Sequence, residues 1–280
     1  MGRQYYQRIN CAEKGKIVKY FMTCQGQAYH QIKGRKIYLL LDYDGTLVPI
    51  ASKPDLAVLP PKTRAILRKL AHYPRCVLAI ISGRSLENIK KMVKIPKIIY
   101  AGNHGLEVDY QGIYQKIIPP DDFPAVLKKL YVSLRQKMKD IKGILIEHKG
   151  MTLSVHYRLA AGKQRLKARH IFFAVIKPYQ ARQQVTVTTG KMVLEIRPPL
   201  KWGKGDFVKW LIKKGAPHRR KPVVFYFGDD RTDEEAFKAL KRRGYAILIG
   251  RHKRSAADYY LKNPAEVSKV LERIEHSLEA

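Results

Sequence analysis

The sequence predicts an α/β fold with a parallel-sheet core and a smaller inserted α+β domain. Short apolar runs rich in β-forming residues alternate with segments of helical spacing, which is the pattern of a parallel sheet wrapped by helices. Several of these runs lead directly into polar or acidic residues. The middle of the chain instead contains two strand pairs separated by a helical segment, which indicates a second, mixed unit.

Four buried strands define the predicted core. Each begins with a nearly uninterrupted apolar run, as expected for a strand covered on both faces, in the segments 36–42, 75–81, 97–105 and 223–234. The segment 61–71 has apolar residues at helical spacing. Ligands of such sheets bind at the carboxyl ends of the strands, so we expect the polar residues that follow these strands to meet along one edge.

The inserted domain is predicted at 108–198. Its first strand pair spans 144–158 and turns at Lys149, and a helical segment around 165–175 separates it from the second pair at 185–197. The predicted organisation is an N-terminal extension without an assigned role (1–35), the first part of the core (36–107), the cap domain (108–198) and the second part of the core (199–280).

The chain is strongly basic, with 55 Lys and Arg against 23 Asp and Glu and a net charge of +32 over 280 residues. Such a molecule attracts phosphates, nucleic acids and anionic membranes nonspecifically. Residues 108–198 carry a net charge of +11, close to an even share, so no segment reads as a dedicated basic arm. No apolar run approaches the roughly 18 residues of a membrane span. We therefore predict no specific nucleic-acid binding and no membrane association.

The cysteines indicate whether the protein is suited to a reducing or an oxidising cellular compartment. Cys11, Cys24 and Cys76 form no C-x-x-C pair and cannot all be paired within one chain. The first residues also lack the continuous apolar stretch of a secretory signal. We expect a cytoplasmic protein and a monomer.

The strongest chemical signal is the pentapeptide at 42–46, Asp-Tyr-Asp-Gly-Thr, which follows the first strand. Two carboxylates two residues apart on a tight glycine turn can point into one site. Asp42 is then available as a nucleophile and metal ligand, and Asp44 as a proton donor. The alternative is a strand followed by an ordinary Asp-Gly turn.

A second acidic cluster follows the last predicted strand. Four acids occupy the six positions 229–234, and grouped carboxylate oxygens suit Mg²⁺. An acidic helix N-terminus would explain Asp233 to Glu235, because the helix dipole favours acids there. It leaves the adjacent Asp229 and Asp230 unexplained.

Ser82 and Lys204 are the candidate phosphate ligands. Ser82 follows the second predicted strand, and Lys204 stands in a Trp-Gly-Lys-Gly segment before a helix. A hydroxyl and an ammonium group are what a phosphoryl group needs as charge builds up in the transition state. Each residue alone is equally compatible with an ordinary surface position.

These motifs together resemble a known family. DYDGT, the serine, the lysine and GDD resemble, in order, the four motifs of the haloacid dehalogenase (HAD) phosphatase superfamily. More narrowly, LLLDYDGTLVPI, ISGR, AGNHGLE, LEIRP, WGKG and GDDRTDEEAF are similar to the trehalose-6-phosphate phosphatases, and the resemblance covers 36–275. It implies a Rossmann-like HAD core with an inserted α+β cap.

The resemblance implies a two-step hydrolysis of trehalose 6-phosphate. Asp42 would attack phosphorus and form an aspartyl-phosphate, while Asp44 protonates the leaving sugar and then activates water. Ser82 and Lys204 would hold the phosphate oxygens. Mg²⁺ is the implied cofactor, with four implied ligand positions: Asp42, the backbone carbonyl of Asp44, Asp229 and, beside them, Asp230.

Sugar recognition is implied for eight residues, four in the cap and four in the core: Glu147, Lys149, Arg158, Glu195, Arg84, Asn103, His104 and Glu107. Simpler readings remain open for several of them. Glu147 and Lys149 flank a strand turn, where charged residues favour water. A cross-strand ion pair is the alternative for Arg158 and Glu195.

The resulting expectation is a Mg²⁺-dependent trehalose-6-phosphate phosphatase of trehalose biosynthesis, with a trehalose-phosphate synthase as a candidate partner. One alternative is a phosphatase for another sugar phosphate, such as sucrose phosphate or mannosyl-phosphoglycerate. Another is a non-catalytic sugar-phosphate sensor, which would be expected to lack a nucleophile or a metal ligand. Every such residue is present.

Overall fold

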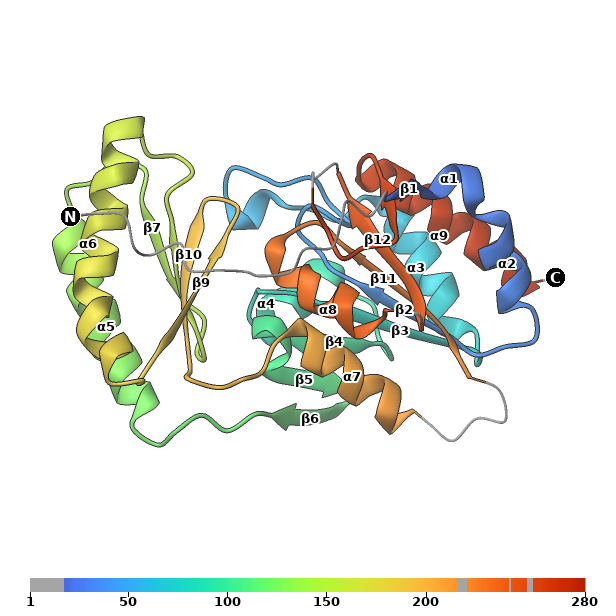
Figure 1. Cartoon of the computed structure of the whole chain (residues 1–280), viewed down its shortest axis with the longest axis horizontal. Helices are drawn as coiled ribbons and strands as arrows, with labels where there is room; N and C mark the ends of the chain where they lie inside the picture. The colour runs from blue at the N-terminus through green and yellow to red at the C-terminus, as the bar shows by residue number, and fades with distance from the viewer. Residues whose placement is uncertain (1–17, 216–220, 242, 251–253, 280) are drawn as a thin grey trace.

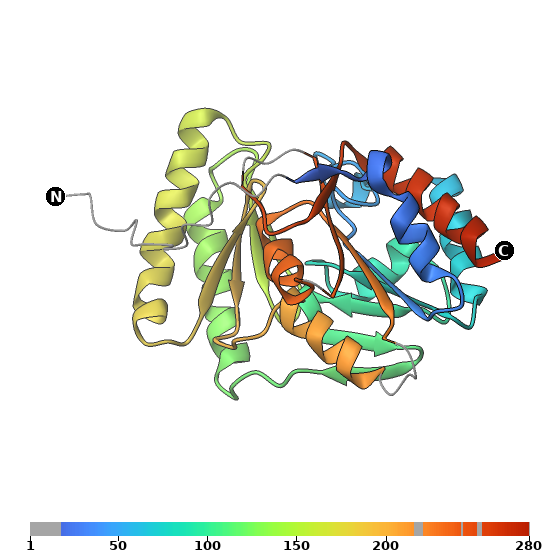
Figure 2. The ribbon, with the colours of Figure 1, turned by 45° about the vertical axis from the view of Figure 1, so that its right-hand side comes forward.

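The computed structural model describes residues 18–215, 221–241, 243–250 and 254–279. The chain forms two sheets that belong to two domains, as Figure 1 shows. The larger sheet has helices on both faces, and the smaller sheet has two helices on its outer side only, which the rotated view in Figure 2 also shows. The predicted α/β class with an inserted α+β unit is confirmed.

The larger sheet has nine strands and is parallel except at one edge. In spatial order its strands are β1 (Lys19–Tyr20), β13 (Tyr259–Leu261), β12 (Gly244–Ile249), β11 (Val223–Gly228), β2 (Ile37–Leu41), β3 (Cys76–Ile81), β4 (Ile99–Gly102), β5 (Glu107–Tyr110) and β6 (Ile113–Lys116). The four predicted strands are β2, β3, β4 and β11. Only β5 and β6 run antiparallel to their neighbours.

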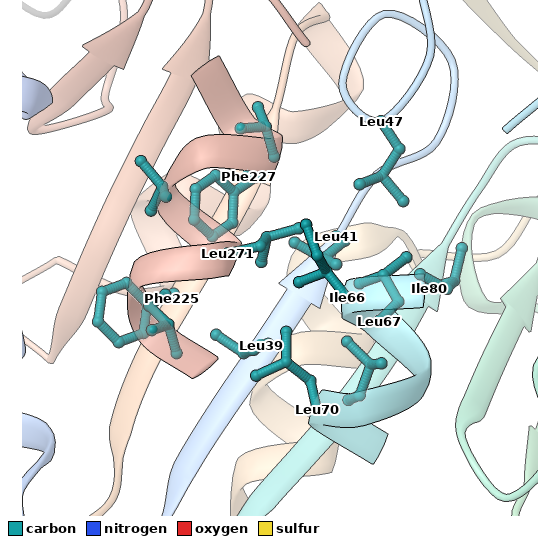
Figure 3. Close-up of a cluster of buried hydrophobic side chains, with 14 of the residues drawn as sticks. Leu39, Leu41, Leu47, Ile66, Leu67, Leu70, Ile80, Phe225, Phe227 and Leu271 are labelled. Carbon is teal, nitrogen blue, oxygen red and sulfur yellow. The ribbon is translucent and has the colours of Figure 1, made fainter. Parts of the chain in front are cut away.

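The apolar runs of the central strands fill both faces of this sheet. Leu39 and Leu41 of β2 pack on one side with α3 (Pro61–His72) and α9 (Pro264–Glu279), as Figure 3 shows. Tyr38 and Leu40 pack on the other side with α7 (Lys204–Lys214) and α8 (Glu234–Ala239). Because successive strand residues point to opposite faces, an uninterrupted apolar run is what a strand between two helical layers requires.

The smaller sheet is antiparallel throughout. Its spatial order is β7 (Leu145–His148), β8 (Leu153–His156), β10 (Val193–Arg197) and β9 (Thr186–Gly190). The helices α5 (Phe123–Met138) and α6 (Gly162–Ala181) cover one face of it and share a separate hydrophobic core with it. This domain therefore has its own core.

Two predicted boundaries need correction. Residues 108–116 were assigned to the insertion, but they form the β5–β6 hairpin at the edge of the core sheet. The hairpin turns at Gln111 and Gly112, both with positive φ, which is typical of a tight two-residue turn. The described part of the predicted extension 1–35 also belongs to the core.

That N-terminal part contains β1 and the short helices α1 (Phe21–Cys24) and α2 (Gly26–Ile32). Phe21, Ala28 and Ile32 are fully buried against the core. Residues 1–17 lie outside the described part of the chain. Within the described ranges, none of the helices is both long and apolar enough to cross a membrane.

Candidate active site

The site begins where two central strands end side by side. β2 and β11 are parallel neighbours, with Leu41 paired to Phe227, so Asp42 and Asp229 leave the sheet at the same edge. The turn after Asp42 depends on Gly45, which has φ +89°. A Cβ at Gly45 would lie 2.0 Å from a carboxylate oxygen of Asp229, so only glycine allows this close approach.

Lys204 joins the acids of this edge into a buried cluster. Its Nζ lies 2.7 Å from Oδ1 of Asp42 and 2.7 Å from Oδ1 of Asp233, and all three side chains are buried. Lys204 is the first residue of α7. Gly205 lets this helix pack closely against α8, because a Cβ at that position would lie 2.7 Å from the carbonyl oxygen of Glu235.

Asp233 is a central member of this cluster, although the sequence analysis explained it as a helix N-terminus. Its Oδ2 accepts hydrogen bonds of 3.0 Å from the backbone N–H groups of Asp229 and Asp230. Its Oδ1 also accepts a 2.7 Å hydrogen bond from the Tyr226 hydroxyl. These contacts fix the loop that carries Asp229.

The electrostatics of the cluster follow from its burial. Burial raises the pKa of Asp42 well above its ordinary value and that of Asp229 to about 7. Burial alone would lower the pKa of Lys204, but Asp233 and Asp42 raise it, so the ammonium stays charged. The three carboxylates of the cluster therefore outnumber the ammonium group of Lys204 that lies among them.

The acids fit a divalent cation. Ligand oxygens of Asp42, Asp229 and Asp233 lie within 4.8 Å of one another. A hard cation with oxygen ligands, such as Mg²⁺, would neutralise the crowded carboxylates. Asp233 belongs to this cluster, although it was not among the predicted ligands, and a metal role for Asp230 stays a prediction. The Asp230 carboxylate instead accepts from the N–H of Arg231 at 2.6 Å and caps the following turn.

Asp44 is held by Arg84. The guanidinium donates two hydrogen bonds of 2.7 Å, from Nε and Nη2, to the two carboxylate oxygens. Arg84 is fixed in turn by the carbonyl of Pro54 at 2.8 Å and by Oδ1 of Asn88 at 2.9 Å. The family resemblance implied a sugar contact for Arg84, and the structure adds two hydrogen bonds from Arg84 to the candidate proton donor.

Four residues of the inserted sheet face the core in a single row. Ser154 pairs with Glu147 on one side and with Glu195 on the other, and Glu195 pairs with Thr188. All four line the pocket between the two sheets. Because strand side chains alternate between faces, the adjacent Leu194 points the other way, into the core beneath α5 and α6.

Glu195 connects this row to the core domain. Its carboxylate accepts from Lys149 at 3.1 Å and lies 2.7 Å from Nε2 of His104. Lys149 also donates to the carbonyl of Gly83 at 2.8 Å. Burial acts to raise the pKa of Glu195, but Lys149 and His104 outweigh it and lower that pKa well below its ordinary value. Burial lowers the pKa of His104 despite the nearby carboxylate.

Arg158 and Glu195 do not form the cross-strand ion pair that was the alternative reading of these two residues. Arg158 donates from Nη2 to the carbonyl of Lys191 at 2.6 Å. Glu147 lies 3.0 Å from Nε2 of His156. Burial alone would raise the pKa of Glu147, but His156 and Lys149 lower it. The turn residues Glu147 and Lys149 thus face the pocket rather than bulk water.

Twelve of the fourteen predicted site residues line this one pocket: Asp42, Asp44, Ser82, Arg84, His104, Glu147, Lys149, Arg158, Glu195, Lys204, Asp229 and Asp230. Asn103 and Glu107, for which sugar recognition was also implied, are not among the lining residues. The side-chain amide of Asn103 donates to Glu107 at 2.5 Å and to the carbonyl of Lys149 at 3.2 Å. Asn103 therefore supports the turn that carries Lys149.

Lys191 is a pocket residue that sequence reasoning missed. It lies in the β9–β10 turn of the inserted domain, its ammonium group contacts the carboxylate of Asp229, and its N–H donates to Asp230 at 3.3 Å. The sequence marked it only as a turn position, and nothing in the local pattern predicted its contact with the core. It brings a cap cation to the candidate metal site.

The family model and the similar proteins of known sequence agree on one family. The model of the trehalose-phosphatase family matches residues 40–265. Trehalose-phosphate phosphatase B of Arabidopsis thaliana is 35% identical over 259 residues, which cover 86% of this chain and 67% of that protein. Trehalose 6-phosphate phosphatase RA3 of Zea mays is 35% identical over 260 residues, which cover 86% of this chain and 70% of that protein.

Solved structures have the same fold. The C-terminal domain of the Candida albicans trehalose-6-phosphate phosphatase superposes with a TM-score of 0.81 at 24% identity, over 92% of this chain and 98% of that one. A trehalose-6-phosphate phosphatase related protein superposes with a TM-score of 0.73 at 26% identity, over 85% and 97% of the two chains.

Proposed function

The chain belongs to the trehalose-phosphatase family, and from this membership we propose that it hydrolyses trehalose 6-phosphate to trehalose and phosphate in trehalose biosynthesis. One observation carries the proposal. Asp42, the candidate nucleophile, lies in the same pocket as the polar row of the inserted sheet, so a phosphate at Asp42 would leave its sugar beside that row.

In the proposed first step, the carboxylate of Asp42 attacks phosphorus and the bond from phosphorus to the sugar oxygen breaks. Lys204 holds one oxygen of Asp42 at 2.7 Å, which fixes the orientation of the attacking group. Asp44 donates a proton to the departing sugar oxygen. Ser82 and Lys204 would hold the remaining phosphate oxygens.

In the proposed second step, water hydrolyses the aspartyl-phosphate. Asp44 is by then a carboxylate, and Arg84 holds it in the bidentate arrangement described above. It accepts the proton of the attacking water, after which phosphate leaves and Asp42 is restored.

Mg²⁺ is the proposed cofactor, held by the side chains of Asp42, Asp229 and Asp233 and by the backbone carbonyl of Asp44. When bound, it supplies positive charge that offsets the repulsion between an anionic nucleophile and an anionic phosphate. The support for it is the donor set itself, which is three buried carboxylates with oxygen atoms close together.

The direct test is phosphate release from trehalose 6-phosphate by the purified chain, with Mg²⁺ and with EDTA. We expect release with Mg²⁺ only, and release at least about tenfold slower from sucrose phosphate and mannosyl-phosphoglycerate. Faster release from one of these would transfer the assignment to that substrate. Binding of trehalose 6-phosphate without release would favour the sensor, against which the complete set of catalytic side chains argues.

A further inference from the structure

The outer layer of the inserted domain consists of α5 and α6, which lie side by side on the side of the small sheet away from the core (Figures 1 and 2). Neither helix contains an acidic residue. α5 carries four lysines and arginines in 16 residues, and α6 carries five in 20. These two helices hold nine of the positive charges in a segment, 108–198, whose net charge is +11.

Seven of the nine basic side chains of this layer are exposed to solvent, and Arg165 and Arg169 are partly buried. The exposed ones are Lys128, Lys129, Arg135, Lys137, Lys163, Lys167 and Lys177. No basic residue of α5 or α6 takes part in a salt bridge with any other described residue. The charge is therefore available to an external partner.

Large apolar side chains stand among these lysines. Leu166 is 70% exposed, Val132 57% and Phe173 39%. Leu166 and Phe173 are seven residues apart on α6, which places them on the same side of the helix about 10 Å apart along its axis. The lysines at 163, 167 and 177 are exposed on the same helix. We name this combination of basic and apolar side chains the α5–α6 face.

We propose that the α5–α6 face binds the surface of an anionic lipid membrane, which departs from the expectation of no membrane association drawn from the sequence. The lysines would meet the negative headgroups, and the leucine, valine and phenylalanine would enter the boundary between headgroups and acyl chains. A nucleic acid would satisfy the charge but would leave Leu166 and Val132 in water. The lysines of the two helices also outnumber their arginines six to three, whereas arginine is the usual choice for bidentate phosphate recognition in nucleic-acid sites.

Such docking would leave the active site accessible. The pocket residues Ser154 and Glu195 project from the opposite face of the sheet that α5 and α6 cover. A membrane-bound molecule would thus keep its pocket open to a soluble substrate. The proposal concerns attachment to a surface and does not involve crossing it.

The test uses the full chain and sedimentation with vesicles of phosphatidylcholine, with and without phosphatidylserine, at physiological salt. We expect binding to the anionic vesicles only. The variant Lys163→Gln/Lys167→Gln/Lys177→Gln should bind at least about tenfold more weakly, because each lysine near an anionic surface contributes to attraction. Leu166→Gln/Phe173→Gln should also lose about tenfold or more, since it keeps the charge but removes the inserted groups.

The matched control is Lys213→Gln/Lys238→Gln/Lys269→Gln, which removes the same charge from exposed positions on core helices. It should bind as the unaltered chain does, within about twofold. All variants should release phosphate normally from an aryl phosphate, which shows that they are folded. Absence of vesicle binding, or equal loss in the control, would overturn the proposal. A nucleic-acid site would give a different pattern. Vesicle binding would survive Leu166→Gln/Phe173→Gln, and the chain would show salt-sensitive RNA binding that the lysine variant loses. That pattern would also overturn the proposal.

Discussion

Nε2 of His104 lies 2.7 Å from Oε2 of Glu195, and this contact joins a loop of the core to a strand of the inserted domain. Lys149 makes a second connection, since it donates both to Glu195 and to the carbonyl of Gly83. The polar row that faces the substrate pocket is thus held in place by core residues. These contacts fix the proposed sugar-facing side of the pocket relative to the core.

Changing Glu195 should therefore affect large substrates more than small ones. We expect Glu195→Ala and Glu147→Ala to lower kcat/KM for trehalose 6-phosphate by about 100-fold or more, because buried polar groups of the site lose their partners. Turnover of a small aryl phosphate should fall by less than about tenfold. The measurement is the ratio of kcat/KM values for the two substrates.

The control for these variants is Glu87→Ala, which changes an exposed acid of α4 (Leu86–Val93) that forms an ion pair with Lys91, one turn further along the same helix. It should leave the substrate ratio unchanged. Equal losses on both substrates in Glu195→Ala and Glu147→Ala would mean that the row does not read the sugar.

Asp42→Asn and Asp44→Asn test the chemistry. Uncatalysed hydrolysis of phosphate monoesters is extremely slow, so loss of the nucleophile should reduce turnover by at least about 10³-fold. Asp44→Asn should reduce it by about 10²-fold or more. Asp55→Asn, an exposed carboxylate near the pocket, should remain fully active. Circular dichroism and thermal unfolding would establish that all three variants fold; near-normal release by Asp42→Asn would refute the mechanism.

The core strands and the acidic residues at their carboxyl ends were predictable from local patterns, whereas the sugar-facing residues were named from the family resemblance. An uninterrupted apolar run predicts a strand buried on two faces, and parallel strands bring their carboxyl ends together, so Asp42 and Asp229 could be placed at one edge from the sequence. The inserted strand pairs were predictable from their turns at Lys149 and Lys191.

The missing parts depend on contacts that no local pattern encodes. Asp233 reads as an ordinary first-turn acid, and only the fold brings Lys204 within 2.7 Å of it. Lys191 reads as a turn residue, and only the packing of the inserted domain on the core places it against Asp229. Residues 108–116 of the edge hairpin were assigned to the inserted domain for a similar reason, because the sequence of a strand does not reveal which sheet it joins.

Lys204 should contribute to stability as well as catalysis. Removal of one partner from a buried ion cluster leaves uncompensated charge, so Lys204→Met should lower the free energy of unfolding by about 3 kcal/mol at neutral pH without metal. Lys209→Met, an exposed position one turn later on α7, should change it by less than about 1 kcal/mol. Urea denaturation measures both.

The double variant Lys204→Met/Asp233→Asn should recover part of that loss, because it removes a buried charge together with its partner. If the double variant is as unstable as the sum of the two single variants, then Lys204 does not act through Asp233.

Gly45→Ala tests the close approach of the two site loops. The new Cβ would lie 2.0 Å from the Asp229 carboxylate, and its φ of +89° is unfavourable for alanine. We expect a large increase in the Mg²⁺ concentration needed for half-maximal activity, about tenfold or more, together with a loss of stability of at least about 1 kcal/mol. Gly162→Ala, which has open space around it and an ordinary φ, should change neither quantity. An unaltered metal requirement in Gly45→Ala would show that the turn does not position Asp229.

The pH dependence of stability should report the burial of Asp229. Its folded-state pKa is raised from 3.8 to about 7, chiefly by burial and then by Asp233. Because the folded state binds this proton more tightly than the unfolded state, Asp229 favours folding at low pH. That contribution is lost as pH rises from about 4 through 7, by up to about 4 kcal/mol in total.

The trend is isolated by subtracting the curve of Asp229→Asn, because other acids such as Glu195 have lowered pKa values and destabilise the fold as pH falls instead. In EDTA, the unfolding free energy of the unaltered chain should decline relative to Asp229→Asn between about pH 4 and 8. Mg²⁺ should restore it more at pH 8 than at pH 5, since a protonated carboxyl cannot bind the cation. Parallel curves in EDTA would mean that Asp229 titrates as a solvated carboxylate and that the three acids do not crowd one another in solution.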